Sequence, residues 1–409
     1  MPSSPTPAKA ARRDASARAC AARALLAIDE GARAEEALAE HAPRDGADRA
    51  MTWNLVLGVL RTRSALDAGI TRAARRAVWT LDAPVLAVLR VGAYELAHTR
   101  APPHAVVHEA VETSRALRVG HASGLVNAVL RRVRVPTEGD AALGFPPWLL
   151  QRWRSRRPDV DAYLRACNEP APVHIVVKDD PAGVAAAFQH QGMALLPTGE
   201  GVFRLPSRTG RVDELPGFAE GRWWVMDPAA VAVADLVPAD AQAVLDTCAA
   251  PGGKSFRLAA RGQAVTATDT AESRLDRLRE GATRLSLPLA MSRHDWNHPF
   301  TGLFDAVLVD APCTALGLVR RHPEIRWRRD EADIERAAER QRAILANAAA
   351  CVRPGGVLVY AVCSPEPEEG PTVAATLDWT EEARFENFGN AEGADVFWAC
   401  RLRRPASPG

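Results

Sequence analysis

From Asp227 onward, short apolar runs alternate with helical segments, and this alternation constrains the fold more than any other feature of the chain. The apolar runs predict strands at 243–245, 264–267, 289–291, 306–309 and 357–360. The segments beside them predict helices at 229–237, 254–261, 271–286 and 331–352. Such alternation forms a parallel sheet with helices on both faces, and ligands bind beyond the carboxyl ends of its strands. We therefore predict a multidomain chain that contains an α/β, Rossmann-like domain over residues 226–405.

The first third of the chain has a purely helical pattern. Apolar residues recur there at three- and four-residue intervals, as in Trp53, Val56, Leu57 and Leu60. This is the spacing of amphipathic helices. Strand signals are few, so we predict an all-α helical domain over residues 13–135.

A third block lies between these two. The β-branched run at 173–177 predicts a strand, and the segments 148–167 and 182–192 predict helices. Residues 202–225 suit short strands between Gly and Pro turns. We predict a small α+β subdomain over residues 145–225.

The overall charge is balanced, with 51 basic and 50 acidic residues, which argues against a strongly basic nucleic-acid-binding chain. Residues 1–140 nevertheless carry 20 Lys and Arg against 15 Asp and Glu, a net of +5. This excess favours an anionic partner for the helical domain. The N-terminal residues lack the apolar segment of a signal peptide, and no apolar run approaches the ~18 residues of a membrane span. We therefore expect a cytoplasmic protein without a membrane contact.

The seven cysteines contain no CxxC pair, so we expect neither a zinc module nor a disulfide framework, and no metal. A buried small hydrophobe is the usual role of a cysteine, and it suits Cys20, Cys167, Cys351 and Cys400. Cys313 and Cys363 differ because each follows a predicted strand, at the edge where a ligand would bind. A disulfide between them is disfavoured in a reducing compartment. A thiolate nucleophile is the sharper hypothesis.

The segment LDTCAAPGGKS (245–255) follows the first strand of the α/β domain and opens a helix. Its glycines allow backbone N–H groups to approach a ligand closely. A phosphate-binding P-loop needs glycine where this chain has Cys248, so a nucleoside triphosphatase is not expected. Asp269 and Asp295 follow the next two strands. A lone Asp there is most often a turn or cap residue, but the series suggests an adenosine ligand whose ribose hydroxyls bind Asp269.

Four strings in this order, DTCAAPGGKS, VLVDAPCTALG, RRHPEIRW and YAVCSPEPEEG, resemble the RNA 5-methylcytosine methyltransferases, which use S-adenosylmethionine. The N-terminal strings GVLR, LRVGAYEL, HAVVHEAV and GLVNAVLRRV are similar to the NusB-like RNA-binding domain of a bacterial branch of that family. That branch acts on small-subunit (16S) ribosomal RNA. The resemblance covers residues 15–404 and implies methyl transfer to carbon 5 of a cytosine in this RNA.

The resemblance also implies catalytic roles. Cys363 would be the nucleophile that adds to carbon 6 of the cytosine, and Cys313 would assist the later elimination. Asp310 would hydrogen-bond the cytosine ring, and Lys254 would support that edge of the ring or the Asp310 carboxylate.

The same resemblance implies a set of cofactor contacts. Asp269 would hold the ribose of S-adenosylmethionine, Asp295 its adenine, and Asp310 would border it. The loop around the cofactor would comprise Cys248, Ala249, Ala250, Pro251, Gly252, Gly253 and Lys254.

Basic residues suggest where RNA binds. The candidates are Arg320, Arg321, Arg326 and Trp327 after the first cysteine motif, and Arg131 and Arg132 at the end of the helical domain. About half of such basic clusters are only a solvated charged face and bind no RNA. Beside a catalytic loop, however, the arginines could pair with phosphates and Trp327 could stack on a base.

Two other functions stay open. A transfer RNA cytosine-C5 methyltransferase would need the same motifs, and a non-catalytic RNA-binding ribosome assembly factor would need only the helical domain and the cofactor site. The intact cysteine pair argues against the assembly factor, and also against a protein or small-molecule methyltransferase, since those reactions need no activation of carbon. Leu316, Gly370 and Met226 stand where the family usually has Thr, Asn and Gln, which puts local substrate contacts in question. We expect a monomer.

Overall fold

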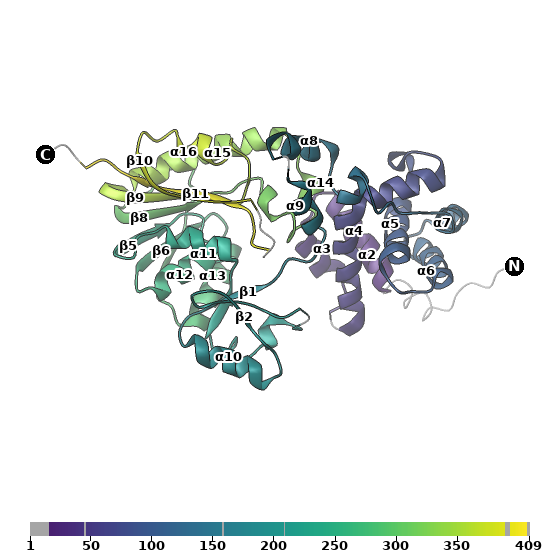
Figure 1. The fold of residues 1–409 in the computed structure, drawn as a ribbon, viewed down its shortest axis with the longest axis horizontal. Coiled ribbons are helices and arrows are strands. Elements are labelled where there is room, and N and C mark those ends of the chain that lie inside the picture. Colours follow the sequence, from purple (N-terminus) through teal and green to yellow (C-terminus); the bar gives the residue numbers. More distant parts are fainter. Residues whose placement is uncertain (1–15, 45, 158, 208, 389–392, 407–409) are drawn as a thin grey trace. The chain divides into compact units, whose positions relative to one another are not determined.

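The computed structural model describes residues 16–406 apart from 45, 158, 208 and 389–392. The chain divides into two compact units (Figure 1). Unit 1 is the chain up to Glu169 together with His322–Arg329, and unit 2 is Pro170–Arg321 with the residues from Asp330 onward. Within the described ranges, none of the helices combines the length and apolar character needed to cross a membrane.

Unit 1 is helical, as the periodicity predicts. It contains α2 (Ala17–Asp29), α3 (Ala34–His41), α4 (Gly46–Ala74), α5 (Ala83–His98), α6 (Pro103–Ala116), α7 (Ser123–Leu130), α8 (Pro147–Arg156), α9 (Asp161–Ala166) and α14 (Ile325–Arg328). Short 3-10 turns lie at Val78–Thr80, Gly120–Ala122 and Asp140–Leu143. The apolar stripes of the helices share one core, which includes Leu25, Leu38, Val56, Leu60, Leu89 and Val126. Burial of these stripes, rather than helix propensity alone, stabilises such a unit.

The structure groups α8 and α9 with unit 1, whereas the sequence predicted them in the α+β subdomain. Side-chain to backbone hydrogen bonds explain the difference. The Ser64 hydroxyl on α4 donates to the Phe145 carbonyl at 3.0 Å, and the Asn168 amide donates to the Leu143 carbonyl at 3.0 Å. Trp153 on α8 is also buried within this unit.

Unit 2 contains a seven-stranded sheet with the order β10-β11-β9-β8-β5-β6-β7. Its strands are β5 (Ala243–Asp246), β6 (Ala264–Asp269), β7 (Leu289–Arg293), β8 (Phe304–Asp310), β9 (Val352–Val362), β10 (Thr380–Asn387) and β11 (Phe397–Arg403). The run from β7 to β9 is parallel, and β11 and β10 are added antiparallel. The strand order reverses between β5 and β8, which is where ligands bind in open α/β sheets.

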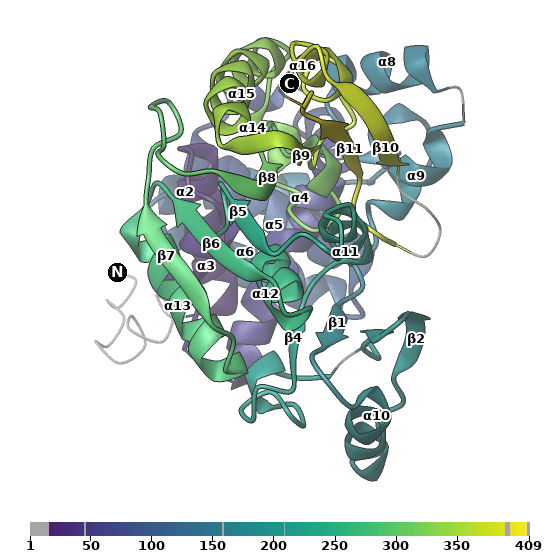
Figure 2. The ribbon, with the colours of Figure 1, turned by 90° about the vertical axis from the view of Figure 1, so that its left-hand side faces the viewer.

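Helices cover both faces of this sheet (Figures 1 and 2). One face carries α11 (Pro228–Asp235), α12 (Gly253–Ala260) and α13 (Glu272–Leu285), and the other carries α15 (Ala332–Ala350) and α16 (Pro371–Ala374). Alternate residues of the central strands serve the two cores, because successive side chains point to opposite faces. Val307 and Leu358 pack with the α15 side, whereas Leu308 and Val359 pack with the α11 and α12 side.

A smaller antiparallel sheet precedes this domain, with the order β2-β3-β1-β4. It consists of β1 (His174–Val177), β2 (Leu196–Gly199), β3 (Val202–Arg204) and β4 (Trp223–Val225), with α10 (Pro181–His190) packed on it. Phe188 of α10 joins Ile175 and Trp223 in a separate core. The predicted strand at 173–177 is therefore present as β1.

The structure accounts for two of the departures from the family pattern. A Cβ placed on Gly370 would lie 2.9 Å from the indole of Trp398, a residue of β11 that is buried in the sheet core. Only glycine leaves room for this ring at that approach. Leu316 is fully buried, so it adds apolar volume to the interior rather than to an open surface.

Gly370→Asn is expected to destabilise unit 2 by about 2 kcal/mol, because the new side chain forces the Trp398 ring to move in a packed core. Urea unfolding followed by tryptophan fluorescence measures the loss. Gly199→Asn on β2 is the matched control, since its Cβ meets Val202 at an ordinary 3.5 Å. Equal stability of the two variants would contradict the assigned role of Gly370.

Candidate active site

The two cysteines singled out from the sequence lie together. Cys363 directly follows β9, and Cys313 lies three residues beyond the end of β8. These strands are parallel neighbours that pair Asp310 with Ala361, so their carboxyl ends share one edge of the sheet. The two Sγ atoms are 3.1 Å apart, and both residues are partly exposed free cysteines.

A backbone contact holds the two cysteine loops against each other. The Gly317 N–H donates to the Cys363 carbonyl at 3.0 Å. A Cβ on Gly317 would lie 2.8 Å from that carbonyl oxygen and 2.3 Å from the Val396 oxygen. The close approach of the loops therefore requires glycine at position 317.

A buried carboxylate joins the residues that follow the two cysteines. Glu369 is fully buried and accepts hydrogen bonds from the Thr314 N–H at 2.7 Å and the Thr314 hydroxyl at 2.5 Å. It also accepts from the Ser364 hydroxyl. Gln341 of α15 donates to Glu369 and to the Pro312 carbonyl, each at 3.1 Å. The backbone on both sides of Cys313 is thus anchored.

Sequence reasoning missed Glu369 and Gln341 as contributors to the site. The available signal was a pair of hydroxyl residues, Thr314 and Ser364, one directly after each motif cysteine. Two buried hydroxyls at one point need a shared hydrogen-bond partner. An acid inside the second motif was the natural candidate for that partner.

The surroundings of Cys313 favour its protonated form. The hydrogen bond to Cys363 raises the pKa of the Cys313 thiol well above its usual range, and burial and the negative charge of Glu369 raise it further. Cys313 therefore keeps its proton at neutral pH. A protonated thiol at 3.1 Å is placed to donate a hydrogen bond to a Cys363 thiolate.

An ion pair borders the cysteines. The Lys254 ammonium lies 2.7 Å from Oδ2 of Asp310, at the end of β8, and 5.0 Å from the centre of the Phe397 ring. Burial alone would lower the pKa of Lys254, but the Asp310 carboxylate and then Asp246 outweigh it and raise the pKa above its ordinary value. Lys254 thus stays charged and fixes the Asp310 carboxylate.

The loop between β5 and α12 forms a cradle for a ligand. Asp246 ends β5 and is buried, and its Oδ2 accepts from the Ser255 hydroxyl at 2.6 Å. Its Oδ1 has no hydrogen-bond partner among the described residues. Burial raises the pKa of Asp246 to about 7, against the hydrogen bond from Ser255, which lowers it. A buried carboxylate oxygen of this kind is suited to a ligand that donates a proton or a hydrogen bond.

Asp269 is the last residue of β6, and Asp295 follows β7 at the same edge of the sheet. Asp269 is buried, and its carboxylate accepts from the Ala250 and Ala271 N–H groups at 3.3 Å each. It therefore fixes the loop from Cys248 to Gly252. Asp295 is exposed, and its carboxylate accepts from the Asn297 backbone at 3.0 Å and side chain at 2.8 Å. These bonds lower the pKa of Asp295, which therefore stays ionised.

Arg326 corrects one expectation about RNA. Its side chain is fully buried in unit 1, over the ring of Phe145, and its guanidinium donates to backbone oxygens of Cys167 at 2.6 Å and Gly144 at 3.0 Å. It also donates to the Asn168 side chain at 2.8 Å. Arg326 therefore exposes no surface to a phosphate, and its predicted RNA contact is wrong in this structure.

The other predicted RNA residues form two groups. Three of them contact other protein groups, and two are exposed. Trp327 donates to the Leu60 carbonyl at 2.8 Å, and Arg321 forms ion pairs with Asp227 and Asp395 at 3.1 and 3.0 Å. Arg320 is half-buried and donates to the Pro170 carbonyl at 3.3 Å. Arg131 and Arg132 are exposed and have no carboxylate partner in the described part of the chain.

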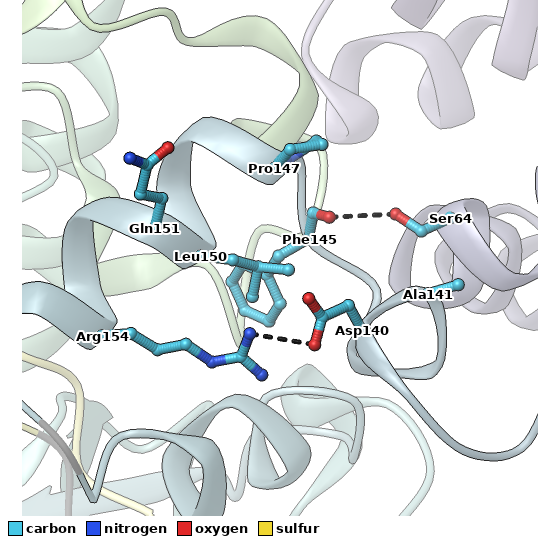
Figure 3. Close-up of a pocket in the computed structure, with 8 residues that line it drawn as sticks. All are labelled: Ser64, Asp140, Ala141, Phe145, Pro147, Leu150, Gln151 and Arg154. Carbon is cyan, nitrogen blue, oxygen red and sulfur yellow. Dashed lines mark hydrogen bonds and ion pairs between the residues drawn. The ribbon is translucent and has the colours of Figure 1, made fainter.

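A cavity of about 540 Å³ lies elsewhere, in unit 1 (Figure 3). Its lining consists of Ser64, Asp140, Ala141, Phe145, Pro147, Leu150, Gln151 and Arg154. Arg154 pairs there with Asp140 and Asp161, each at 2.9 Å. Its charged groups satisfy one another, and none of the predicted site residues contributes to the lining. The described residues also hold no cluster of three or more His, Cys, Asp or Glu side chains suited to a metal ion.

Comparison with known proteins gives matches over both units. Residues 233–398 match a family model described as 16S rRNA methyltransferase RsmB/F, and residues 15–134 match the NusB family. "Ribosomal RNA small subunit methyltransferase B" of Salmonella arizonae is 34% identical over 387 residues, which are 87% of this chain and 90% of the relative. The protein of the same name from Escherichia fergusonii is 33% identical over equal shares of the two chains.

Two solved structures share the fold. The crystal structure of PH0851 has a TM-score of 0.78 at 20% identity and covers 94% of this chain and 99% of that one. NSun6 from Pyrococcus horikoshii has a TM-score of 0.56 at 18% identity, over 64% of this chain and 98% of that one. At these identities the likeness concerns the fold alone.

Proposed function

Since the chain belongs to the RsmB/F family of 16S ribosomal RNA methyltransferases, we propose that it methylates carbon 5 of a cytosine in that RNA through a covalent bond between Cys363 and carbon 6 of the base. The observation that carries the proposal is the pair of sulfur atoms 3.1 Å apart at the carboxyl ends of β8 and β9. The ion pair of Lys254 and Asp310 borders the same edge.

S-adenosylmethionine is the cofactor of this family. When bound, it supplies an electrophilic methyl group from its sulfonium. The residues present fit this cofactor, because the unpartnered Oδ1 of buried Asp246 suits the ammonium of its methionine part. We assign the ribose of the cofactor to Asp269 and its adenine to the edge that carries Asp295. Residues 248–254 are assigned as the protein loop that surrounds the cofactor.

The chemistry explains why a thiolate is needed. Carbon 5 of cytosine is a weak nucleophile. When the Cys363 sulfur adds to carbon 6, the electron pair of the C5–C6 double bond moves to carbon 5, which can then accept a methyl group. Carbon 5 afterwards loses its proton to solvent, the electron pair of that C–H bond restores the C5–C6 double bond, and the S–C6 bond breaks with its electron pair leaving on the Cys363 sulfur. Covalent catalysis thus divides one difficult step into easier ones.

We assign different roles to the two thiols. We assign the attack to Cys363, which directly follows β9, and we assign the Cys313 S–H, 3.1 Å away, as its hydrogen-bond donor. The same S–H group stabilises the Cys363 sulfur as it leaves carbon 6. Loss of Cys313 should therefore slow release of the product more than attack.

Asp310 and Lys254 are assigned to recognition of the base. Lys254 holds Oδ2 of Asp310 at 2.7 Å, and we assign Oδ1 to the exocyclic amino group of cytosine. Uracil has no such donor, so this contact favours cytosine. A base that is paired or stacked in the RNA must first leave its stack to reach these residues.

A methylation assay tests the function directly. The purified chain is incubated with S-adenosylmethionine and either small-subunit ribosomal RNA or transfer RNA, each from cells that lack the gene. Nucleoside mass spectrometry should detect new 5-methylcytidine only in the ribosomal RNA. Methylation of transfer RNA alone would favour a transfer RNA cytosine-C5 methyltransferase. The absence of 5-methylcytidine from both RNAs would refute the proposal.

Glu369→Ala is expected to lower kcat at least about tenfold, with KM for S-adenosylmethionine within about twofold. The substitution leaves the donors of Thr314, Ser364 and Gln341 unsatisfied in the interior, which releases the cysteine loops. Glu369→Gln should recover most of kcat, because both hydroxyls can accept as well as donate hydrogen bonds. A kcat of Glu369→Ala equal to that of the wild type, with turnover measured under saturating substrates, would contradict this positioning role.

A further inference from the structure

One tryptophan of unit 1 is displayed to solvent. Trp79 is 84% exposed, the highest value among the large apolar side chains of the described residues. It lies in the short 3-10 turn between α4 and α5, where the Leu81 N–H donates to the Val78 carbonyl at 3.1 Å. Leu81 is buried in the helical core and Val78 packs against it. The turn is therefore anchored on both sides of an indole that makes no polar contact of its own within the described chain.

Unpaired arginines precede this tryptophan. Arg72, Arg75 and Arg76 lie at and just beyond the end of α4, and all three are exposed. None has a carboxylate within 4.0 Å in the described ranges, and Arg72 contacts only the Ala68 carbonyl. Arg75 has a φ of +57°, which ends the helix and turns the chain toward Trp79. This φ is uncommon for a residue other than glycine.

Two other arginines of unit 1 show the contrast with the end of α4. Arg63, on the same helix, lies 2.7 Å from Asp29, and Arg90 lies 2.8 Å from Asp67. Near the turn, Asp82 is exposed and lies 3.9 Å from His121 rather than beside an arginine. No carboxylate of this kind neutralises the three arginines at the end of α4 within the described residues.

The segment after α7 extends this basic area. A Cβ placed on Gly69 of α4 would lie 2.8 Å from the Arg134 carbonyl oxygen, one turn of helix before Arg72. Arg131, Arg132 and Arg134 are exposed and, like the α4 arginines, have no carboxylate partner among the described residues. The segment that follows α7 therefore runs beside α4 and carries further exposed arginines.

We propose that Trp79 and the arginines at 72, 75 and 76, here called the Trp79 surface, dock single-stranded RNA, with the indole stacked on an unpaired base and the arginines on the flanking phosphates. The inference rests on the proposed function, because it takes RNA as the substrate of the chain. Aromatic faces combined with basic side chains are the usual means of binding unpaired nucleotides, because every base offers a face to stack on and every phosphate a negative charge. A duplex would satisfy the arginines but leave the indole without a base.

Two variants of the full chain separate the stacking part from the ionic part. Binding is measured by fluorescence anisotropy of a short fluorescein-labelled single-stranded RNA over a range of KCl concentrations. Trp79→Ala should weaken binding about tenfold at every salt concentration and leave the salt dependence unchanged. The triple variant Arg72→Gln, Arg75→Gln, Arg76→Gln should reduce the slope of log affinity against log salt by about 2, since each phosphate contact on a single strand contributes about 0.7.

The controls are chosen for matched exposure. Leu303→Ala removes another large exposed side chain (55% exposed), and Arg277→Gln removes an exposed arginine of α13 that also has no carboxylate partner in the described chain. Neither should change the affinity or the slope. On a duplex RNA of the same length, Trp79→Ala should alter the affinity less than twofold.

Wild-type affinity of Trp79→Ala for the single strand would overturn the proposal, as would an unchanged slope in the triple variant. An equal loss on the duplex would also overturn it, because the indole would then not be stacking. The measurement needs no methyl transfer. If the surface binds RNA but no 5-methylcytidine forms, the proposed function fails alone; if methylation proceeds while these variants bind normally, this inference fails alone.

Discussion

Cys363→Ala is expected to reduce methyl transfer at least about a thousandfold while leaving S-adenosylmethionine binding within about twofold. The variant removes the atom that forms the bond to carbon 6, and without that bond carbon 5 stays unreactive. The Asp246, Asp269 and loop 248–254 cradle contains no atom of Cys363, so the cofactor site is preserved. Turnover with ribosomal RNA and calorimetric titration of the cofactor measure the two effects separately.

The matched control is Cys351→Ala. This buried thiol belongs to the same unit and packs in the core beside α15. Its removal should cost about 1 kcal/mol of stability and leave turnover within about twofold. Turnover of Cys363→Ala at the level of this control would refute the assignment of the nucleophile.

Cys313→Ala is expected to convert the enzyme into one that stays bound to its RNA. Attack by Cys363 still proceeds, but the thiol that stabilises the departing sulfur is gone, so the S–C6 bond persists. A band of protein linked to RNA should survive a denaturing gel and should accumulate with time. The double variant Cys313→Ala, Cys363→Ala should form none.

A failure to find such a band would count against the release role of Cys313, provided that the single variant still binds RNA. A band of equal intensity in the double variant would mean that another nucleophile forms the link. The two cysteines are 50 positions apart in the sequence, and their sulfur atoms are 3.1 Å apart in the structure. The single and double variants therefore test two neighbouring sulfur atoms, one assigned to attack on the base and the other to release of the product.

The parallel core of the fold could be predicted because its strands are buried on both faces and read as continuous apolar runs. The runs at 306–309 and 357–360 are β8 and β9, and this places Cys313 and Cys363 at one edge of the sheet, since the carboxyl ends of parallel strands meet there. Their 3.1 Å contact also requires that β8 and β9 are neighbours in the sheet. β10 was not predicted. Half of the residues in its sequence, TEEARFEN, are charged, and its side chains are mostly exposed at the edge of the sheet.

Other parts of the site could not be predicted because they depend on tertiary contacts. Arg326 resembles an RNA-binding arginine in sequence, yet it fills the interior of unit 1, where backbone oxygens from residues 144 and 167 accept its hydrogen bonds. Glu369 contacts both cysteine loops only because the chain after β9 folds back over them. No periodicity or spacing reports which carbonyl or hydroxyl groups converge on a buried charge.

Peptide mapping of the trapped complex tests the central claim most directly. The RNA-linked Cys313→Ala protein is digested with a protease and a nuclease, and the cross-linked fragment is sequenced by tandem mass spectrometry. The account predicts one cytosine nucleotide joined to the sulfur of the peptide that contains Cys363. A nucleotide attached at any other residue, or a base other than cytosine on Cys363, would contradict it.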